Sequence, residues 1–218
     1  MNCINTNTQS ILPGCTSQRV LEGAGPVYVI DLSNENLAPI GTLLNGNSQT
    51  LTRAGSAIVY ILGHGLPDNL VFGDQKIPER DIAAYIKEAR GNAPTLVVWD
   101  VCYAETFYDL QPSDSANAAP DEKRPKENFW GTSFVHIFGS RKHELAWHRG
   151  DDKESATEFG AAFVAALTTD RSKWSDWASL EEALRNRMRD FQTPTILPRP
   201  AELAQDERPP VTDFFPSG

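Results

Sequence analysis

Two side chains suited to covalent catalysis, a histidine and a cysteine, each stand just after an apolar stretch of this sequence. His64 lies between two glycines beyond Ser56–Leu62, and Cys102 follows Thr95–Trp99 after two intervening residues. A thiolate is a strong nucleophile, and a nearby imidazole can take up and return its proton. If the fold brings the two together, the pair predicts nucleophilic attack on a carbonyl group.

The segments around these residues predict a β-α-β unit. Both apolar stretches are bounded by Gly or Pro, which is typical of buried strands. Between them, residues 77–90 carry apolar side chains at helical spacing: Ile82, Tyr85, Ile86 and Ala89. A right-handed crossover makes the two strands parallel and brings their carboxyl ends to one edge of the sheet. Open α/β sheets build their sites at that edge, so we expect His64 and Cys102 to meet there.

Asp100 and Gly65 extend the predicted site. Asp100 precedes Cys102 by two residues, so in an extended segment both side chains point to the same face, on the order of 7 Å apart. A carboxylate at the bottom of a pocket selects a cation such as Arg or Lys. Gly65 allows a substrate backbone to approach closely, and its amide, with that of Cys102, can supply two donors to a developing oxyanion.

Each of these residues also has a purely structural interpretation. A single cysteine at a strand end is usually a small buried hydrophobe, a Gly-His-Gly sequence is usually a turn, and Asp100 alone can cap the turn that follows it. The joint placement of the three is what favours catalysis. The other histidines have no paired metal-ligand spacing and no C-x-x-C is present, so we predict no metal and no other cofactor: His136, His143 and His148.

Composition narrows the class of protein. A chain of 218 residues favours one domain with a sizeable core. The net charge of −9, with no basic stripe, argues against a nucleic-acid partner. No apolar stretch approaches the roughly 20 residues that cross a bilayer, and no signal-peptide pattern is visible, so we expect no membrane partner. The three cysteines (Cys3, Cys15 and Cys102) do not suggest a disulfide scaffold, which favours a reducing cytoplasm.

Four regions can be distinguished along the chain. Residues 1–24 are polar and aperiodic, and we expect a flexible leader or irregular arm. Residues 25–200 form the predicted domain. Within it, residues 109–128 hold three prolines and many charges, which predicts an exposed, mobile loop. Residues 201–218 form a Pro-rich tail.

The remaining elements of the predicted domain alternate between strand and helix. We expect strands over 27–32, 134–138 and 194–197, and helices over 34–44, 158–167 and 180–191, the last capped by Ser179. Strands alternating with helices predict an α/β fold whose mostly parallel central sheet is covered on both faces.

With these landmarks in order, the sequence resembles the caspase-like cysteine peptidases, the superfamily of caspases, metacaspases, paracaspases and CHAT-domain proteins. The resemblance covers residues 27–197. It is carried by His64-Gly65, by the segment DVCYA at 100–104, and by FVHIFGS, EFGAAFVAAL and QTPTIL further on. It implies a three-layer α/β/α sandwich. Cys102 is followed by Tyr-Ala-Glu rather than the His-Ser-Gly common in metacaspases, which favours a divergent, bacterial-type member.

The resemblance also implies roles for individual residues. His64 would be the general base and acid, and Cys102 the nucleophile of a peptidase. Asp100 matches the pocket aspartate of metacaspases and paracaspases, which implies a protein substrate cut after Arg or Lys. Asp31 would add a second pocket acid, and Ser140 matches the stretch that pairs with the substrate backbone in these enzymes.

The charged loop at 109–128 sits where caspase relatives are cut during maturation. We expect self-cleavage after Lys123 or Lys126, since Pro125 disfavours a cut after Arg124. An activating or regulatory protein partner is also compatible with the resemblance. Two alternatives stay open: a catalytically inactive caspase-fold interaction module, and a different doubly wound hydrolase or small-molecule binder in which His64 and Cys102 are structural.

Overall fold

The computed structural model describes residues 55–71, 76–108, 129–148, 156–198 and 208–215 in full, and only the backbone of residues 72 and 75 and of the strands at 4–5, 10–11 and 27–31. The helix expected over 34–44 lies outside the described residues. So does the loop over 109–128, with Lys123 and Lys126.

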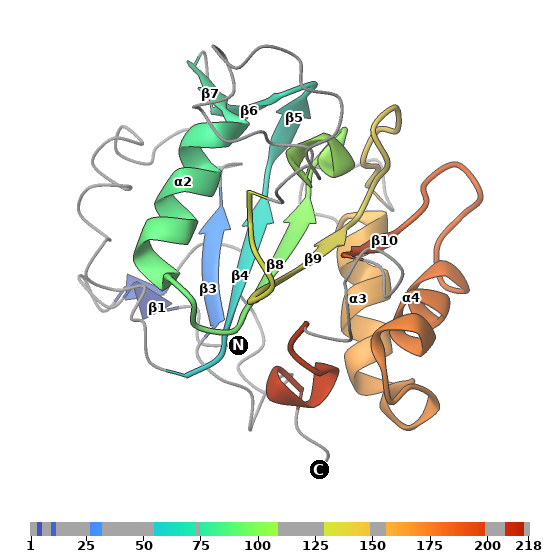
Figure 1. Cartoon of the computed structure of the whole chain (residues 1–218). Coiled ribbons are helices and arrows are strands. Elements are labelled where there is room, and N and C mark those ends of the chain that lie inside the picture. Colours follow the sequence, from blue (N-terminus) through green and yellow to red (C-terminus); the bar gives the residue numbers. More distant parts are fainter. Residues whose placement is uncertain are drawn as a thin grey trace, which may run out of the picture.

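A five-stranded sheet forms the centre of the molecule (Figure 1). Its order is β10-β9-β8-β4-β3, with β3 at Val27–Asp31, β4 at Ala57–Leu62, β8 at Thr95–Asp100, β9 at Phe134–Phe138 and β10 at Thr195–Leu197. Four strands are parallel, and β10 runs antiparallel to β9. The predicted strands lie within two residues of these bounds, and the mostly parallel sheet is confirmed.

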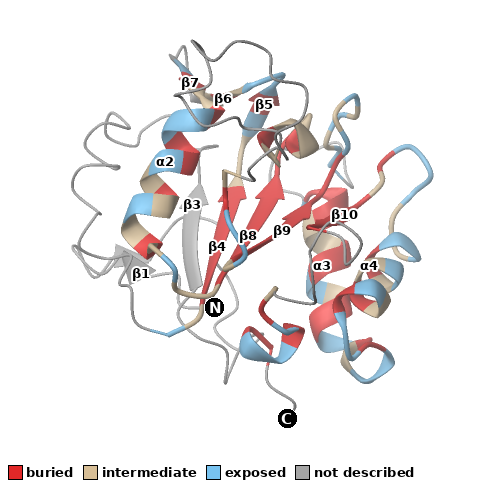
Figure 2. Ribbon diagram, in the orientation of Figure 1, coloured by how far each residue is buried: buried red, intermediate tan, exposed pale blue. Residues whose placement is uncertain are grey.

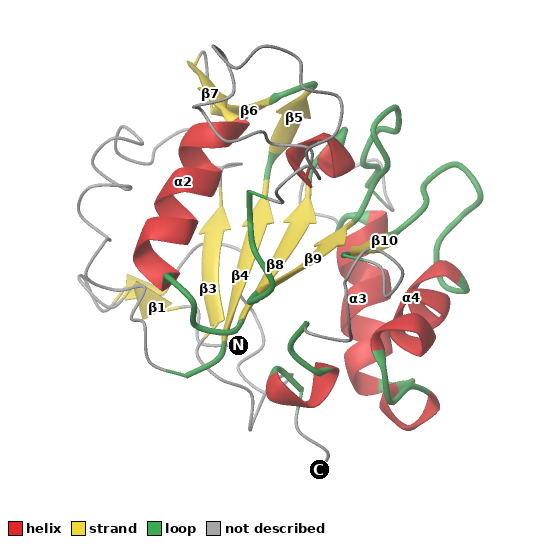
Figure 3. Cartoon of the chain, viewed as in Figure 1, coloured by secondary structure: helices red, strands yellow, loops and turns green. Residues whose placement is uncertain are grey.

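Helices cover both faces of this sheet, which gives the predicted three layers (Figure 3). On one face lies α2 (Glu79–Arg90), and on the other α3 (Glu158–Thr168) and α4 (Trp177–Arg185). A hydrophobic core lies on each face of the sheet, and alternate residues of β8 pack into one or the other. Val97 and Trp99 pack on the α2 side, and Leu96 and Val98 on the α3–α4 side. The inner strands are therefore buried on both faces, as parallel strands between helices must be (Figure 2).

A second, smaller sheet extends beyond the carboxyl end of β4 (Figure 1). It is antiparallel, in the order β5 (His64–Leu66), β6 (Asn69–Phe72) and β7 (Gln75–Pro78), and α2 begins directly after it. Three 3-10 helices complete the described elements: η1 (Ala104–Tyr108), η3 (Arg171–Lys173) and η5 (Val211–Asp213). No helix in the described part of the chain has the length and apolar character that a bilayer crossing needs.

Two regions at the ends of the chain hold structure that the sequence did not suggest. Within residues 1–24, β1 (Ile4–Asn5) pairs antiparallel with β2 (Ser10–Ile11). In the Pro-rich tail, residues 208–215 bury Val211, Phe214 and Phe215 in the α3–α4 core. The indole of Trp177 donates to the Pro209 carbonyl at 2.9 Å, which ties this segment to α4.

The helix predicted over 180–191 is wrong in its bounds, because a stronger cap lies upstream. Asp176 caps α4: its carboxylate accepts from the Ser179 amide at 2.8 Å, and the Ser179 hydroxyl accepts from the Asp176 amide at 3.2 Å. Ser179 thus serves at the third helical position of a capping box and not as the cap itself. The helix ends at Arg185.

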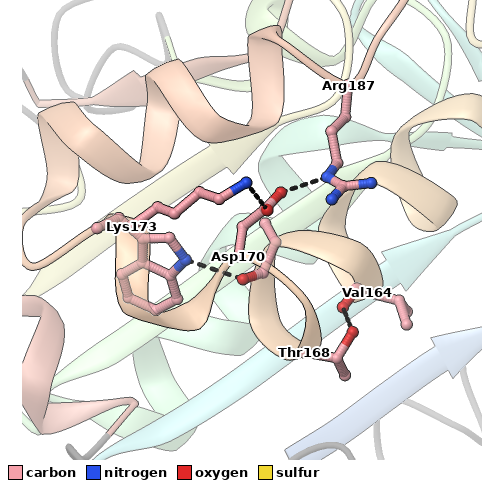
Figure 4. Close-up of polar contacts among 7 residues, drawn as sticks. Val164, Thr168, Asp170, Lys173 and Arg187 are labelled. Carbon is pink, nitrogen blue, oxygen red and sulfur yellow. Dashed lines mark hydrogen bonds and ion pairs between the residues drawn. The ribbon is translucent and has the colours of Figure 1, made fainter.

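An ionic cluster joins the end of α3 to the chain after α4 (Figure 4). The Asp170 carboxylate accepts a hydrogen bond from Arg187 and forms an ion pair with Lys173 at 2.6 Å. Hydrogen bonds from Arg187 and then Lys173 hold the pKa of Asp170 well below its usual range. The cluster fixes the two helices of this layer to each other.

One histidine is enclosed in the core on the α2 side. His136 of β9 is fully buried beside the rings of Trp99, Trp130 and Phe138. Its Nδ1 accepts from the Trp99 indole at 3.1 Å, and burial lowers its pKa to about 3. His136 is therefore a neutral core residue.

Acid should destabilise the folded protein through His136. The unfolded chain binds this proton near pH 6.5 and the folded chain only near pH 3, so the stability that His136 contributes is complete above pH 6.5. It falls as the pH drops below 6.5, by up to about 1.4 kcal/mol per pH unit. In His136→Phe this loss is absent. The unfolding free energy of the wild-type protein minus that of the variant, both measured with urea, should therefore fall from pH 6.5 to pH 4. A difference that stays constant would contradict the assignment, and His143→Phe, at an exposed histidine, is the control.

Candidate functional site

The register of β4 and β8 brings the predicted catalytic residues to one edge of the sheet. Leu62 is paired with Asp100, and the Gly63 amide donates to the Asp100 carbonyl at 3.4 Å. His64 and Cys102 each lie two residues beyond this pair. The two residues therefore leave the sheet at equivalent positions on neighbouring parallel strands.

Gly65 lies directly against the main chain of Cys102. A Cβ atom on Gly65 would overlap the Cys102 carbonyl oxygen and would stand 3.1 Å from its carbonyl carbon and 3.2 Å from its nitrogen. This close approach requires glycine for steric reasons. It places the strand that carries His64 beside the turn that carries Cys102.

His64 begins β5, where its main chain pairs with Val71 of β6. Its side chain is exposed. The small antiparallel sheet thus fixes the histidine backbone and leaves the imidazole accessible to a ligand.

Cys102 is a free, half-buried thiol. The Ala146 amide donates to its sulfur at 3.3 Å, and the Ala146 carbonyl lies 3.9 Å from the same atom. The chain that follows β9 therefore forms one wall around the sulfur. An amide donor interacts more strongly with a thiolate than with a thiol, since hydrogen bonds to charged acceptors are the stronger ones.

The turn after Cys102 is strained and held in place from several sides. Tyr103 has φ +58°, a left-handed conformation that costs a residue other than glycine about 1 kcal/mol or more. Its amide donates to the Glu144 carbonyl at 2.9 Å. The fully buried Ser140 hydroxyl donates to the Val101 carbonyl at 2.8 Å and accepts from the Ala104 amide at 3.0 Å. Ser140 therefore braces the turn, and its contact with a substrate backbone stays a prediction.

Asp100, the last residue of β8, is only 2% exposed. Its Oδ2 accepts hydrogen bonds from the Tyr60 hydroxyl at 2.8 Å and the Thr157 hydroxyl at 2.5 Å. Its Oδ1 is buried and has no hydrogen-bond partner among the described residues. Burial raises the pKa of Asp100 to about 6, against the lowering effect of the two hydrogen bonds and of nearby His148.

Asp31 lies at the same level of the sheet. It ends β3 and is paired with Leu62, the residue that pairs with Asp100 on the other side. Its side chain lies outside the described residues, so its role as a second pocket acid stays a prediction. In the described part of the chain, no group of three or more His, Cys, Asp or Glu is placed to hold a metal ion.

Comparison of sequences finds no relative: neither a protein-family model nor a curated protein matches this chain. Solved structures do match. A protein from Geobacter sulfurreducens (GSU0716) superposes with a TM-score of 0.51 at 17% identity, over 77% of each chain. Caspase-1 from Spodoptera frugiperda superposes with a TM-score of 0.50 at 14% identity, over 73% of this chain and 67% of that one.

The fold is caspase-like. This confirms the fold class expected from the resemblance, and at such low identity the likeness shows the fold alone. Within this caspase-like fold, the roles of individual residues rest on the geometry of the sheet edge.

Three residues around Asp100 were missed from the sequence. Tyr60 carries the one polar side-chain group, a hydroxyl, in the apolar strand β4. Thr157 immediately precedes α3 and caps the helix, since its hydroxyl accepts from the Gly160 amide at 2.8 Å. A Cβ atom on Gly160 would lie 3.1 Å from Asp100 Oδ2. The tyrosine hydroxyl in an apolar strand and the threonine at a helix start could both be recognised in the sequence. Their convergence on Asp100 was not visible, because it depends on packing between separate elements.

Gly65→Ala should disturb the position and reactivity of Cys102. The added methyl group overlaps the Cys102 main chain, so we expect a loss of roughly 1–3 kcal/mol of stability and slower alkylation of Cys102 by iodoacetamide. Gly131→Ala is the matched control. Gly131 has φ +74° and open space around it, so alanine there adds backbone strain without a steric overlap, at a position distant in the sequence from Cys102. Equal alkylation rates at Cys102 in both variants, located by peptide mass spectrometry, would contradict the contact.

Proposed function

We propose that this protein is a cysteine endopeptidase that hydrolyses peptide bonds after a lysine or arginine residue, with Cys102 as nucleophile and His64 as general base and acid. The observation that carries the proposal is the contact of Gly65 with the Cys102 main chain. It sets an exposed imidazole and a half-buried thiol on adjoining segments at the carboxyl edge of a parallel sheet.

The proposed reaction uses side chains and amides of this chain and one water molecule. His64 takes the thiol proton as the Cys102 sulfur attacks the peptide carbonyl carbon, and the negative charge that develops on oxygen is met by the amides of Gly65 and Cys102. His64 then gives the proton to the departing amine as the C–N bond breaks. A water molecule, deprotonated by His64, attacks the thioester carbon, the C–S bond breaks, and the thiol is regenerated.

Asp100 supports the preference for a basic residue. Its carboxylate is buried at the same sheet edge, two residues before the nucleophile, and one of its oxygens has no partner among the described residues. Above a pH of about 6 this group is ionised, and a cation is the partner that offsets burial of its charge. The proposed substrate is a protein that offers such a side chain.

Cys102→Ala and His64→Ala should each abolish turnover of a fluorogenic peptide library with basic residues before the cut, by a factor of at least about 1,000, because the dyad acts as a unit. A chloromethylketone carrying Lys or Arg should label Cys102 of the wild-type protein. Cys15→Ala and His143→Ala, which remove the same side chains elsewhere, should keep full activity. A wild-type protein that neither cleaves the library nor takes the label is instead the inactive interaction module.

Self-cleavage should follow from the same activity. Purified wild-type protein should yield fragments ending at Lys123 or Lys126, whereas Cys102→Ala should remain intact. Mass spectrometry of the two preparations gives the comparison. Identical fragments from both would show that another protease cuts the loop.

A further inference from the structure

The two oxygens of the Asp100 carboxylate have very different surroundings. Oδ2 accepts from Tyr60 at 2.8 Å and from Thr157 at 2.5 Å. Two donors use both lone pairs of that oxygen. Gly160 closes the space beside it, since even a Cβ atom there would lie 3.1 Å from Oδ2. Oδ2 is therefore fully occupied by the protein itself.

Oδ1, by contrast, is buried and has no hydrogen-bond partner among the described residues. A buried carboxylate oxygen without a donor is an unfavourable arrangement, and a positively charged donor relieves it best. One atom of Asp100, and not the whole carboxylate, thus lacks the donor that a bound cation would supply.

The two donors cannot easily leave Oδ2 when a ligand enters. The Thr157 hydroxyl is held at both ends, because it donates to Asp100 and accepts from the Gly160 amide at 2.8 Å as the cap of α3. The Tyr60 side chain is 8% exposed and packs in the α3–α4 core. Contacts from β4, β8 and α3 therefore fix the orientation of the carboxylate.

We propose that Tyr60 and Thr157 are positioning residues that reduce Asp100 to a single-oxygen acceptor, and that the pocket consequently prefers lysine to arginine immediately before the cut bond. This inference rests on the proposed peptidase function. The guanidinium of arginine is a rigid fork that matches both oxygens of a carboxylate, whereas the lysine ammonium is a compact charge that one oxygen can bind. Both expected self-cleavage sites, Lys123 and Lys126, are lysines.

The test uses two fluorogenic peptides that differ only in Lys or Arg before the cut bond. The readout is the ratio of their kcat/KM values, which a merely structural role of Tyr60 would leave unchanged. For the wild-type protein we expect lysine to be favoured by about fivefold or more, the equivalent of one hydrogen bond. Tyr60→Phe keeps the ring and removes one donor to Oδ2, so the ratio should fall by about threefold or more toward arginine.

Tyr85→Phe is the matched control, because Tyr85 is a half-buried tyrosine of α2 that packs against the other core. It should leave the ratio unchanged. Thr157→Val removes the other donor and should shift the ratio in the same direction as Tyr60→Phe. If neither variant folds, the wild-type ratio decides the question alone.

The outcomes separate this inference from the function on which it rests. A wild-type protein that cleaves neither peptide defeats the proposed peptidase. A wild-type protein that cleaves the arginine peptide as well as or better than the lysine peptide defeats only the single-oxygen pocket. The same holds if the ratio of kcat/KM values is unchanged in Tyr60→Phe. Asp100→Asn, which removes the charge, should lower turnover of both peptides by at least about 30-fold and abolish the discrimination.

Discussion

The close approach of Gly65 to the Cys102 main chain is the constraint on which the rest of the site depends. It is possible because β4 and β8 pair in a register that aligns Leu62 with Asp100, and a one-residue slip would turn every buried side chain of β4 to the wrong face. The register is therefore fixed by two cores at once. The positions of His64 and Cys102 therefore result from hydrophobic packing in the two cores of the sheet.

Two buried ionisable residues of the central sheet show how burial produces opposite results. His136 is surrounded by aromatic rings, accepts from the Trp99 indole and stays neutral, so the core encloses no charge at this position. Asp100 sits at the carboxyl end of the neighbouring strand with one oxygen satisfied twice and the other not at all. Of these two residues, the one that can carry a charge near neutral pH is thus Asp100, at the sheet edge and two residues before Cys102.

Much of the framework could be predicted from the sequence, because apolar runs bounded by Gly or Pro mark buried strands wherever they occur. The strands at 57–62, 95–100 and 134–138 follow this pattern, and the helix at 158–168 was predicted from its small and apolar side chains. The short antiparallel sheet after β4 could not be predicted, since its strands are only three or four residues long and His64 begins one of them. The start of α4 was missed because the cap at Asp176 competes with Ser179, and periodicity alone does not decide between neighbouring caps. The contacts of Tyr60 and Thr157 with Asp100 join residues 40 and 57 positions apart, which no local pattern encodes.

The packing of residues 208–215 into the α3–α4 layer has a consequence for biosynthesis. Phe214 and Phe215 complete the same buried cluster as Ile58 of β4 and Phe163 of α3. These two rings are synthesised after all five strands of the central sheet, so the buried cluster of the α3–α4 layer is completed last on the nascent chain. Cys102 is thus synthesised roughly a hundred residues before translation supplies the last side chains of the α3–α4 core.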